Sequence, residues 1–445
     1  METSKGFFKG VCGIAIPVTL QSMLQSSFSV VDQIMIGQLG STSIAAVGLA
    51  GKFSSIFSVI ASAVAAVAGI MMAQYAGQSN RRELRRSFFV NLSLAGGIAV
   101  LFTLLCLLIP GPIMGLYTKD RETCRLAARY LRILSATYLP AAGAALLAAW
   151  FRCMDRAVLS LYASAAAAAL NTGLNYVLIF GRLGAAPMGV TGAAIATAAS
   201  QLVNLAIMLA LYFRFAERTA RTPAQGRFHW RQYAGMLLPV LICELLWSLG
   251  ENVYAVIYGH LGTQACAAMT LINPIQSLMI GALCGLSQAA GVLIGKQLGG
   301  QDFGGAYRSS RLLMLYGLCG SAALSLLLLL TKSLYVTIYQ VEPVVRQLAA
   351  QILTAYALIA PFKIQNMILG GGILRSGGRT DYVMWVDLIG TWVFGVPLGL
   401  LAAFCWNLSI PYVYFLLSLE ECVRFGISLW IFRRRGWMRQ LEGSR

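Results

Sequence analysis

An aspartate stands inside a long apolar run near the start of the chain, in the stretch SFSVVDQIMIGQLG at residues 27–40. A charged side chain near the centre of a membrane-spanning helix costs roughly 2.5–3.5 kcal/mol. Asp32 therefore needs compensating partners or a function that requires its charge. Ser22, Gln25 and Ser29 precede it in steps of three and four residues, so all four side chains share one helical face. Such a polar stripe faces a bundle interior or a water-filled cavity rather than lipid.

Amide and hydroxyl side chains that suit this carboxyl lie in two later apolar segments. Asn171 and Asn175 are four residues apart and share a helical face, and Thr197 adds a hydroxyl. Amides donate and accept hydrogen bonds, so they can bind a carboxyl in either protonation state. Burial favours the neutral acid, whereas a nearby cation favours the carboxylate. We expect Asp32 to hold either a proton or a cationic substrate, as exchange requires; a structural aspartate satisfied by the amides is the alternative.

The C-terminal half contains a second candidate site with more ionisable residues. Glu244 and Glu251 share a helical face, with Trp247 beside them. A carboxylate next to an indole can hold an organic cation through charge and cation–π contacts. These residues are therefore candidates for substrate binding, and a purely structural role is an equal alternative.

Charged residues on three predicted helices of this half fall at similar depths. Counting about 1.5 Å per residue from the basic ends, Glu244, Lys363 and Glu421 lie roughly 15–16 Å into the membrane. This shared depth predicts a buried network in which Glu244 interacts with Lys363. The alternative is a fixed ion-pair cluster that stabilises this half, in which Glu420 and Arg424 are spaced as an i,i+4 pair.

The elements that must position these residues are membrane-spanning helices. The chain has 445 residues, of which 58% are hydrophobic and only 11% charged, a composition that soluble domains do not have. Apolar stretches of about 20 residues or more recur along it, each long enough to cross a bilayer. The ten cysteines lie scattered without a CxxC motif, so we expect neither disulfides nor a metal site. Twelve spans are predicted, at 11–36, 44–73, 88–110, 126–151, 158–180, 190–213, 233–258, 266–295, 312–331, 347–373, 382–404 and 410–432.

The placement of positive charge predicts the orientation of these spans. Of the 34 lysine and arginine residues, 23 lie at the termini or in the even-numbered connections, and 8 lie in the odd-numbered connections. Cytoplasmic loops of membrane proteins carry an excess of lysine and arginine. We therefore expect a protein of the cell membrane with both termini in the cytoplasm. The net charge of +18 is then a consequence of topology, and we expect no nucleic-acid partner.

The two halves of the sequence repeat one another. PVTLQSMLQS at 17–26 recurs as PVLICELLWS at 239–248, and GQLGSTSIAA at 37–46 recurs as GHLGTQACAA at 259–268. Both pairs are offset by 222 residues. An ungapped register of this length is typical of an internal duplication.

The duplication predicts two six-helix bundles in the same orientation. Each half contains an even number of spans, so the repeats are parallel and related by an axis along the membrane normal. We assign 1–222 to the N-terminal lobe and 223–445 to the C-terminal lobe, joined by the polar stretch 214–232. Two similar bundles suit transport by alternating access; a scaffold or a channel is the alternative.

Several motifs resemble the multidrug and toxic compound extrusion (MATE) family along nearly the whole chain. They are VDQIMIGQLGSTSIAAVGLA from Val31, AQYAGQ from Ala73, NTGLNYVLIFG from Asn171, MGVTGAAIATAAS from Met188, GKQLGGQD from Gly295 and LRSGGRTD from Leu374. The resemblance implies twelve helices in two lobes, V-shaped with a central cavity, and drug efflux in exchange for protons or sodium ions. It also implies an ion-linked cluster at Asp32, Asn171, Asn175 and Thr197, whereas an acid in the seventh span varies in position within the family.

The expected function is therefore an antiporter that exports amphipathic, cationic, drug-like compounds. A lipid-linked saccharide flippase of the wider superfamily is the alternative, which Lys52 and Lys363 slightly favour. A major-facilitator transporter is disfavoured because GQSNRRELRR at 77–86 does not match that superfamily's loop motif, and nothing speaks for a receptor. No nucleotide-binding motif or catalytic constellation is present, so we expect no enzyme and no cofactor besides the coupling ion. We expect a monomer in the bilayer.

Overall fold

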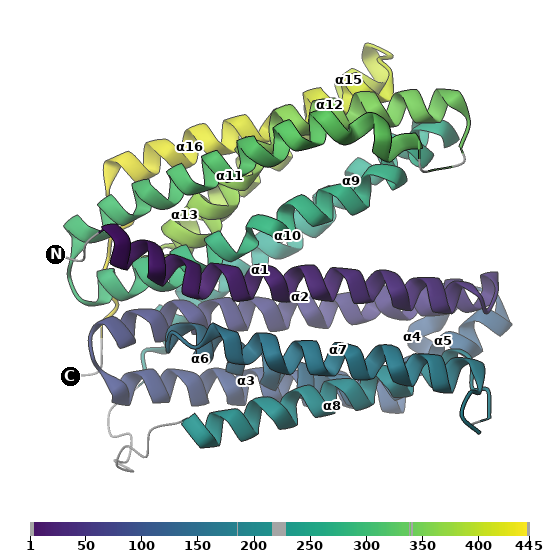
Figure 1. Ribbon diagram of the computed structural model, residues 1–445, viewed down its shortest axis with the longest axis horizontal. Helices are drawn as coiled ribbons and strands as arrows, with labels where there is room; N and C mark the ends of the chain where they lie inside the picture. The colour runs from purple at the N-terminus through teal and green to yellow at the C-terminus, as the bar shows by residue number, and fades with distance from the viewer. Residues whose placement is uncertain (1–3, 185, 216–227, 338, 340, 443–445) are drawn as a thin grey trace. The chain divides into compact units, whose positions relative to one another are not determined.

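The computed structural model describes residues 4–184, 186–215, 228–337, 339 and 341–442. Every regular element in these ranges is helical (Figure 1). The central part of the predicted linker, 216–227, and the predicted lobe boundary at 222/223 lie outside the described residues. The division into the lobes 1–222 and 223–445 stays a prediction.

Long apolar helices dominate both halves. Those of the N-terminal half are α1 (Ser4–Gly37), α2 (Ser41–Gly77), α3 (Arg81–Leu108), α4 (Pro110–Gly115), α5 (Arg121–Leu134), η1 (Ser135–Thr137), α6 (Tyr138–Cys153), α7 (Ala157–Phe180) and α8 (Val190–Phe215). Those of the C-terminal half are α9 (Trp230–His260), α10 (Thr263–Gly299), α11 (Phe303–Thr337), α12 (Pro343–Asn366), η2 (Met367–Leu374), α13 (Thr380–Asp387), η3 (Leu388–Gly395), α14 (Val396–Leu400), η4 (Leu401–Cys405), α15 (Ile410–Ser418) and α16 (Glu420–Arg434).

Eleven helical segments of the described chain are long and apolar enough to cross a membrane, and they coincide with the first eleven predicted spans. The twelfth predicted span, 410–432, is covered by α15 and α16, of 9 and 15 residues, which meet at Leu419. Neither piece alone has the length of a span, and their junction carries Glu420 and Glu421. The interruption at Leu419, which divides the segment into two short helices, distinguishes it from the other eleven.

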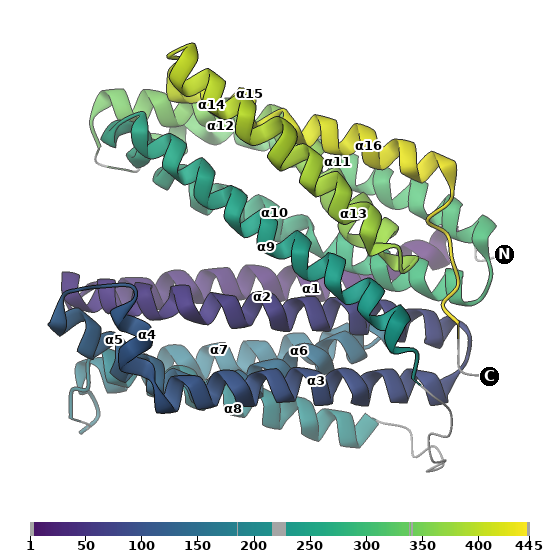
Figure 2. The same cartoon turned by 180° about the vertical axis from the view of Figure 1, so that it is seen from behind.

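The chain forms two compact units whose boundaries cut through α1 and α2. One unit consists of Leu20–Met72 and Arg81–Gly226, and the other combines Met1–Thr19 and Ala73–Asn80 with Arg227–Arg445. In the former, α7 packs along α8, and α3 packs along α6 (Figure 1). In the latter, α11 packs along α12, and α9 packs beside α13 (Figure 2).

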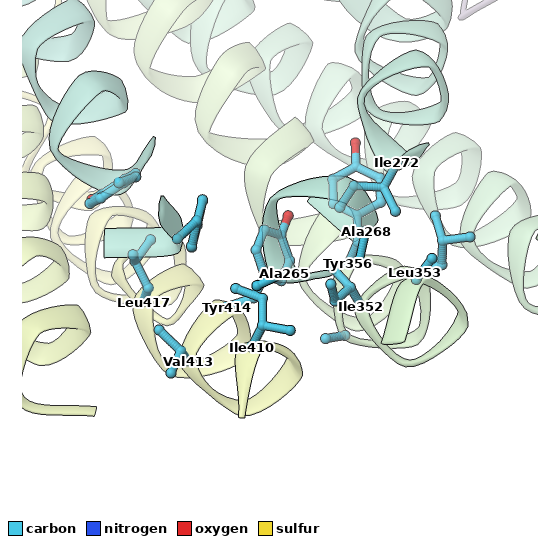
Figure 3. Packing of buried hydrophobic residues seen from close by; sticks show 14 of the residues in the cluster. Ala265, Ala268, Ile272, Ile352, Leu353, Tyr356, Ile410, Val413, Tyr414 and Leu417 are labelled. Atoms are coloured by element: carbon cyan, nitrogen blue, oxygen red, sulfur yellow. The ribbon is translucent and has the colours of Figure 1, made fainter. Parts of the chain in front are cut away.

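A core of small and branched side chains holds α10, α12 and α15 together in the unit that contains the C-terminal half (Figure 3). Ala265, Ala268 and Ile272 follow one another along α10 in steps of three and four, which places them on one helical face. They meet Tyr356 of α12 and Tyr414 of α15 within this cluster. Lipid tails are as apolar as these side chains, so close packing rather than burial from water stabilises the contact.

Glycines allow the ends of α2 and α10 to touch through their backbones. A Cβ atom added at Gly77 would lie 1.9 Å from the carbonyl oxygen of Lys296, and one added at Gly299 would lie 2.0 Å from that of Gln74. Gly77 and Gly299 are 222 residues apart, as are Gln74 and Lys296. The contact is therefore reciprocal between repeat-related residues, which is the pattern that a twofold relation produces.

Wide helical turns interrupt α12 and α13 beside the charged residues. The π-helical segment η2 begins directly after Asn366, and η3 begins directly after Asp387. Such segments are frequent at functional sites because they change the direction of the side chains that follow. In η2 the absence of a side chain at Gly372 permits close approach to the carbonyl oxygen of Ser287, whose hydroxyl donates to the carbonyl of Met367 at 2.6 Å.

Candidate functional site

The carboxyl of Asp32 meets the two asparagines of α7, as their spacing suggests. The Nδ2 of Asn175 donates to Asp32 Oδ1 at 2.6 Å, and Asn175 is buried while Asp32 is half-buried. The polar stripe of α1 thus reaches a neighbouring helix within the same unit. Among the described residues Asp32 has no cationic partner, so its contacts are those of a carboxyl held by neutral dipoles.

The amide of Asn171 can be placed in two orientations, and each suits a different state of Asp32. In one, its nitrogen donates to Thr197 Oγ1 and Ser200 Oγ, both at 3.4 Å, and its oxygen accepts from Asn175 at 3.2 Å. In the other, its nitrogen lies 3.0 Å from both carboxyl oxygens of Asp32 and donates to them. An amide oxygen so close to a carboxyl requires a proton on the acid, whereas an amide N–H favours the carboxylate.

Thr197 belongs to this carboxyl–amide cluster, but Gln25 does not. The hydroxyl of Thr197 donates to the carbonyl of Ala193 at 3.0 Å and remains able to accept from Asn171. Gln25 is exposed on α1, two helical turns or about 10 Å from Asp32. Ser200 is buried and completes the cluster. We did not predict Ser200 from the sequence, although it is three residues beyond Thr197 and so falls on the same face of α8.

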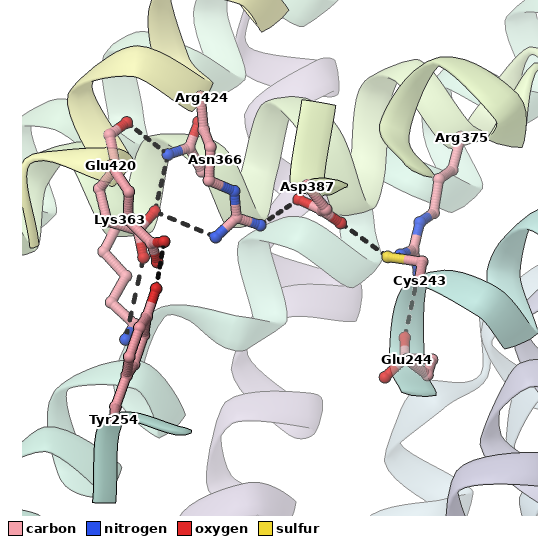
Figure 4. Close-up of polar contacts among 10 residues, drawn as sticks. Cys243, Glu244, Tyr254, Lys363, Asn366, Arg375, Asp387, Glu420 and Arg424 are labelled. Carbon is pink, nitrogen blue, oxygen red and sulfur yellow. Dashed lines mark hydrogen bonds and ion pairs between the residues drawn. The ribbon is translucent and has the colours of Figure 1, made fainter. Parts of the chain in front are cut away.

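The second candidate site is a chain of charged side chains in the other unit, which we call the charge network (Figure 4). At its centre Glu421 lies 3.9 Å from Lys363 Nζ and 3.5 Å from Arg424 Nη1. The Nδ2 of Asn366 also donates to Glu421 Oε2 at 2.8 Å. Glu421 is buried, with 6% of its side chain exposed, so these contacts are what make its charge tolerable. Its members are Cys243, Glu244, Tyr254, Lys363, Asn366, Arg375, Asp387, Glu420, Glu421 and Arg424.

The network continues from Arg424 toward α9 (Figure 4). Arg424 pairs with Asp387, and the thiol of Cys243 donates to Asp387 Oδ2 at 2.6 Å. Arg375 donates to the sulfur of Cys243 at 3.3 Å and lies 3.5 Å from Glu244 Oε1. Successive contacts thus connect α16, α13 and α9 with Arg375, the residue that follows η2.

Two expected pairings in this network are corrected by the structure. Glu244 pairs with Arg375 rather than with Lys363, whereas Lys363 pairs with Glu421, the third residue predicted at this depth. Arg375 lies just beyond the predicted span 347–373, but it is helical and its long side chain is only 15% exposed. Arg424 pairs with Glu421 three residues before it, whereas Glu420 accepts from the hydroxyl of Tyr254 at 2.5 Å.

Two hollows within this unit open onto the network. One of about 310 Å³ is lined by Glu251, Glu420 and several tyrosines, including Tyr254, Tyr258 and Tyr414. The other, of about 280 Å³, is lined by Glu244, Trp247, Lys363, Arg375, Asp387, Glu421 and Arg424, among others. Lys363 and Glu421 line both hollows, so they separate them. Glu251 and Trp247 are exposed, and no ion pair is formed by Glu251 in the described residues.

Within the described ranges no three His, Cys, Asp or Glu side chains gather in a way that would hold a metal ion. Cys243 contacts one carboxylate, that of Asp387, and one guanidinium, that of Arg375. Both candidate sites present carboxyl groups, which can bind protons or cations.

The chain is similar to a known protein family and to individual members of it. A model named MatE matches residues 17–177 and again residues 239–401. The two matches begin 222 residues apart, which confirms the duplication read from the sequence. The chain is 26% identical over 420 residues to a protein of Agrobacterium fabrum named "Probable multidrug resistance protein NorM", covering 91% of this chain and 87% of that one. A protein of Rhizobium meliloti with the same name is 27% identical over 419 residues, with the same coverage.

Solved structures share the fold. A "Crystal structure of MATE in complex with MaL6" has a TM-score of 0.88 at 18% identity and covers 96% of both chains. A structure described as "Reverse polarity of binding pocket suggests different function of a MOP superfamily transporter from Pyrococcus furiosus" has a TM-score of 0.86, also at 18% identity, and covers 98% of both chains. These likenesses confirm the predicted fold class, an all-α polytopic membrane protein of twelve helices in two repeats.

Proposed function

Since this chain belongs to the MatE family of multidrug efflux transporters, we propose that it exports amphipathic organic cations in exchange for protons or sodium ions. Membership of the family makes it a multi-pass membrane protein and a transporter, not an enzyme. The nature of the substrate, the coupling ion and the alternating-access mechanism are the parts that we propose.

The observation that carries the proposal is the contact of Asp32 with two neutral amides. A carboxyl held by Asn171 and Asn175 can gain or lose charge without leaving a buried cation unpaired. The Asn171 amide can donate to the carboxylate through its nitrogen or accept from the protonated acid through its oxygen. Asp32 can therefore bind a proton at one stage of the cycle and a cation at another, and this competition couples the two fluxes.

The charge network supports the same function from the other unit. Four carboxyls, those of Glu244, Asp387, Glu420 and Glu421, face the three cations Lys363, Arg375 and Arg424. With all seven ionised, one negative charge remains, which a proton or a bound cation neutralises. The hollow of about 310 Å³ adds tyrosine rings and Glu251, a lining that suits an organic cation through charge and cation–π contacts.

The remaining expectations complete the proposal. The protein acts in the inner or plasma membrane as a monomer, with both termini in the cytoplasm, because positive charge is concentrated on that side. It uses no nucleic-acid partner, metal or organic cofactor, and the ion gradient supplies the energy.

Separately imposed ion gradients test this proposal. Proteoliposomes containing the purified protein and a fluorescent organic cation are given either a proton gradient or a sodium gradient, with the membrane potential clamped. We expect one of the two imposed ion gradients to accelerate movement of the fluorescent organic cation against the concentration gradient of that compound. Movement that neither gradient accelerates, in vesicles whose protein is folded and correctly inserted, contradicts antiport.

A lipid-linked saccharide flippase is the second candidate. The hollow of about 280 Å³ is lined by Lys363, Arg375 and Arg424 together with three carboxyls, and its guanidinium groups have the geometry to bind an anionic ligand such as a diphosphate. The same vesicles therefore include a fluorescent lipid-linked saccharide. Its protein-dependent transfer between leaflets, without cation efflux, would support this candidate over the first.

A further inference from the structure

We propose that a groove between α11, α12 and α16 binds an anionic phospholipid, with its phosphate at the basic end and part of an acyl chain along the apolar floor. The groove has a volume of about 820 Å³ and lies in the unit that contains the C-terminal half. It contains none of the residues of the carboxyl–amide cluster or the charge network. The proposal is independent of what the protein transports.

The long part of the groove is apolar and open. Leu315 and Leu318 of α11 are about half exposed, at 51% and 48%, and Phe362 of α12 is 37% exposed. Phe425 and Leu429 of α16 line the opposite side. From Phe425 to the last turn of α16 the groove runs along eight residues, or about 12 Å. These dimensions suit a segment of extended hydrocarbon better than a compact polar ligand.

Positive charge is confined to one end of the groove. Arg308 and Arg311 come from the first turns of α11, and Arg433 comes from the last turn of α16. All three are exposed, and none has a hydrogen-bond or ion-pair partner in the part of the chain that the structure describes. Arg435 adds a fourth positive charge nearby, since its guanidinium lies 4.4 Å from the centre of the Tyr307 ring that lines the same end.

A buried polar atom also lines the groove without a partner. Gln365 is 3% exposed, and its Nε2 donates to the carbonyl of Met314 at 2.8 Å, but its Oε1 accepts no hydrogen bond. A buried acceptor left in this way costs about 1–3 kcal/mol. A hydroxyl donor from a lipid backbone or head group, or a water that it brings, would satisfy it.

Charge complementarity identifies the class of ligand. Basic pockets between membrane helices at the cytoplasmic side suit anionic head groups, and the apolar groove accepts the chain attached to them. A cationic substrate would be repelled by the guanidinium groups, and a free phosphate would leave the apolar floor uncovered. An anionic phospholipid satisfies both ends at once.

Native mass spectrometry of the full-length, detergent-purified protein tests the proposal. The ligands are dioleoyl-phosphatidylglycerol, dioleoyl-phosphatidylcholine with the same chains, and soluble glycerol phosphate. Each arginine near an anionic head group is worth about 1 kcal/mol, or about fivefold in affinity. We therefore expect Arg311→Gln to weaken phosphatidylglycerol binding about fivefold, and Arg311→Gln with Arg433→Gln to weaken it about thirtyfold.

Arg434→Gln is the matched control. Arg434 is in the same helical turn as Arg433 and is also exposed, but its guanidinium lies 3.8 Å from the Trp430 ring and it does not line the groove. We expect the Arg434→Gln variant to bind phosphatidylglycerol with the same affinity as the parent protein. Thermal unfolding verifies that each variant is folded. If the double variant is not folded, the single variant Arg308→Gln takes its place.

Three outcomes would overturn the proposal. The first is an unchanged affinity in the folded arginine variants, and the second is equal binding of phosphatidylcholine. The third is glycerol phosphate binding as tightly as phosphatidylglycerol, which would show an anion site that takes no acyl chain.

Discussion

Asp32 and Glu421 are both carboxyls inside membrane helices, but their partners differ in charge. Asp32 is held by neutral amides, so protonation removes its charge without leaving a cation behind. Glu421 is held by Lys363 and Arg424, so its protonation would remove a carboxylate that both cations contact. This difference favours Asp32 as the exchanging group and gives Glu421 a role in holding α12 and α16 together.

The partner of Glu244 can be identified by a double-mutant cycle. Glu244→Gln leaves Arg375 without its carboxylate, and Glu244 is 31% exposed, so we expect a loss between the values for surface and buried pairs, about 1–2 kcal/mol. Adding Arg375→Met should recover part of the loss in thermal stability, because it removes the unpaired charge. The matched control adds Lys363→Met instead, for which we expect additive losses. Additive losses with Arg375→Met, or recovery with Lys363→Met, would contradict the pairing seen in the structure.

Residue patterns predicted one candidate site far better than the other. The steps along α1 and α7 located the Asp32–Asn175 contact, because helical faces follow directly from spacing. Depth along separate helices grouped Lys363 with Glu421 but did not identify the partner of Glu244, because Arg375 lies outside the predicted span 347–373 and its long side chain reaches Glu244. The contact of Cys243 with Asp387 could not be foreseen, since no periodicity distinguishes one buried cysteine from nine others.

At the scale of elements, the reciprocal approach of α2 and α10 depends on two glycines. Gly77→Ala and Gly299→Ala each place a methyl group within about 2 Å of a backbone oxygen, so the helices must separate. We expect each substitution to cost about 1–3 kcal/mol and to lower the melting temperature, with similar effects because the sites are repeat-related. Differential scanning fluorimetry in detergent measures this.

Gly69→Ala provides the matched control in α2. A Cβ atom at Gly69 would have no neighbour within 4 Å, so the substitution should be neutral or slightly stabilising through helix propensity. A loss at Gly69 as large as at Gly77 would indicate a general effect of mutating this helix. No loss at Gly77 or Gly299 would show that the helices do not approach this closely.

Helix positions were predictable because about 20 consecutive apolar residues have few other uses in a long chain. The π-helical segments η2, η3 and η4 were not, since their widened turns arise from packing between helices and leave no period in the sequence.

At the scale of the whole molecule, the charge bias predicts topology. Thr222→Cys, in a stretch outside the described residues, should resist a membrane-impermeant maleimide in intact cells of a cysteine-free variant and react after permeabilisation. Leu183→Cys, in the connection between α7 and α8, should react in intact cells, because that side is expected to be external and Leu183 is 91% exposed. Labelling of Thr222→Cys from outside would contradict the twelve-span orientation.

Exchange at Asp32 is the central claim, and Asp32→Asn tests it most directly. The amide is close in shape to the carboxyl and cheaper to bury, so the variant should fold and insert at normal levels. It cannot release a proton, so gradient-driven efflux of the organic cation should fall to the rate of protein-free vesicles across pH 6 to 8. Equilibrium binding should survive in part through aromatic and apolar contacts. Parent-like efflux by the folded variant over that pH range would contradict the account and move the coupling to the carboxyls of the charge network.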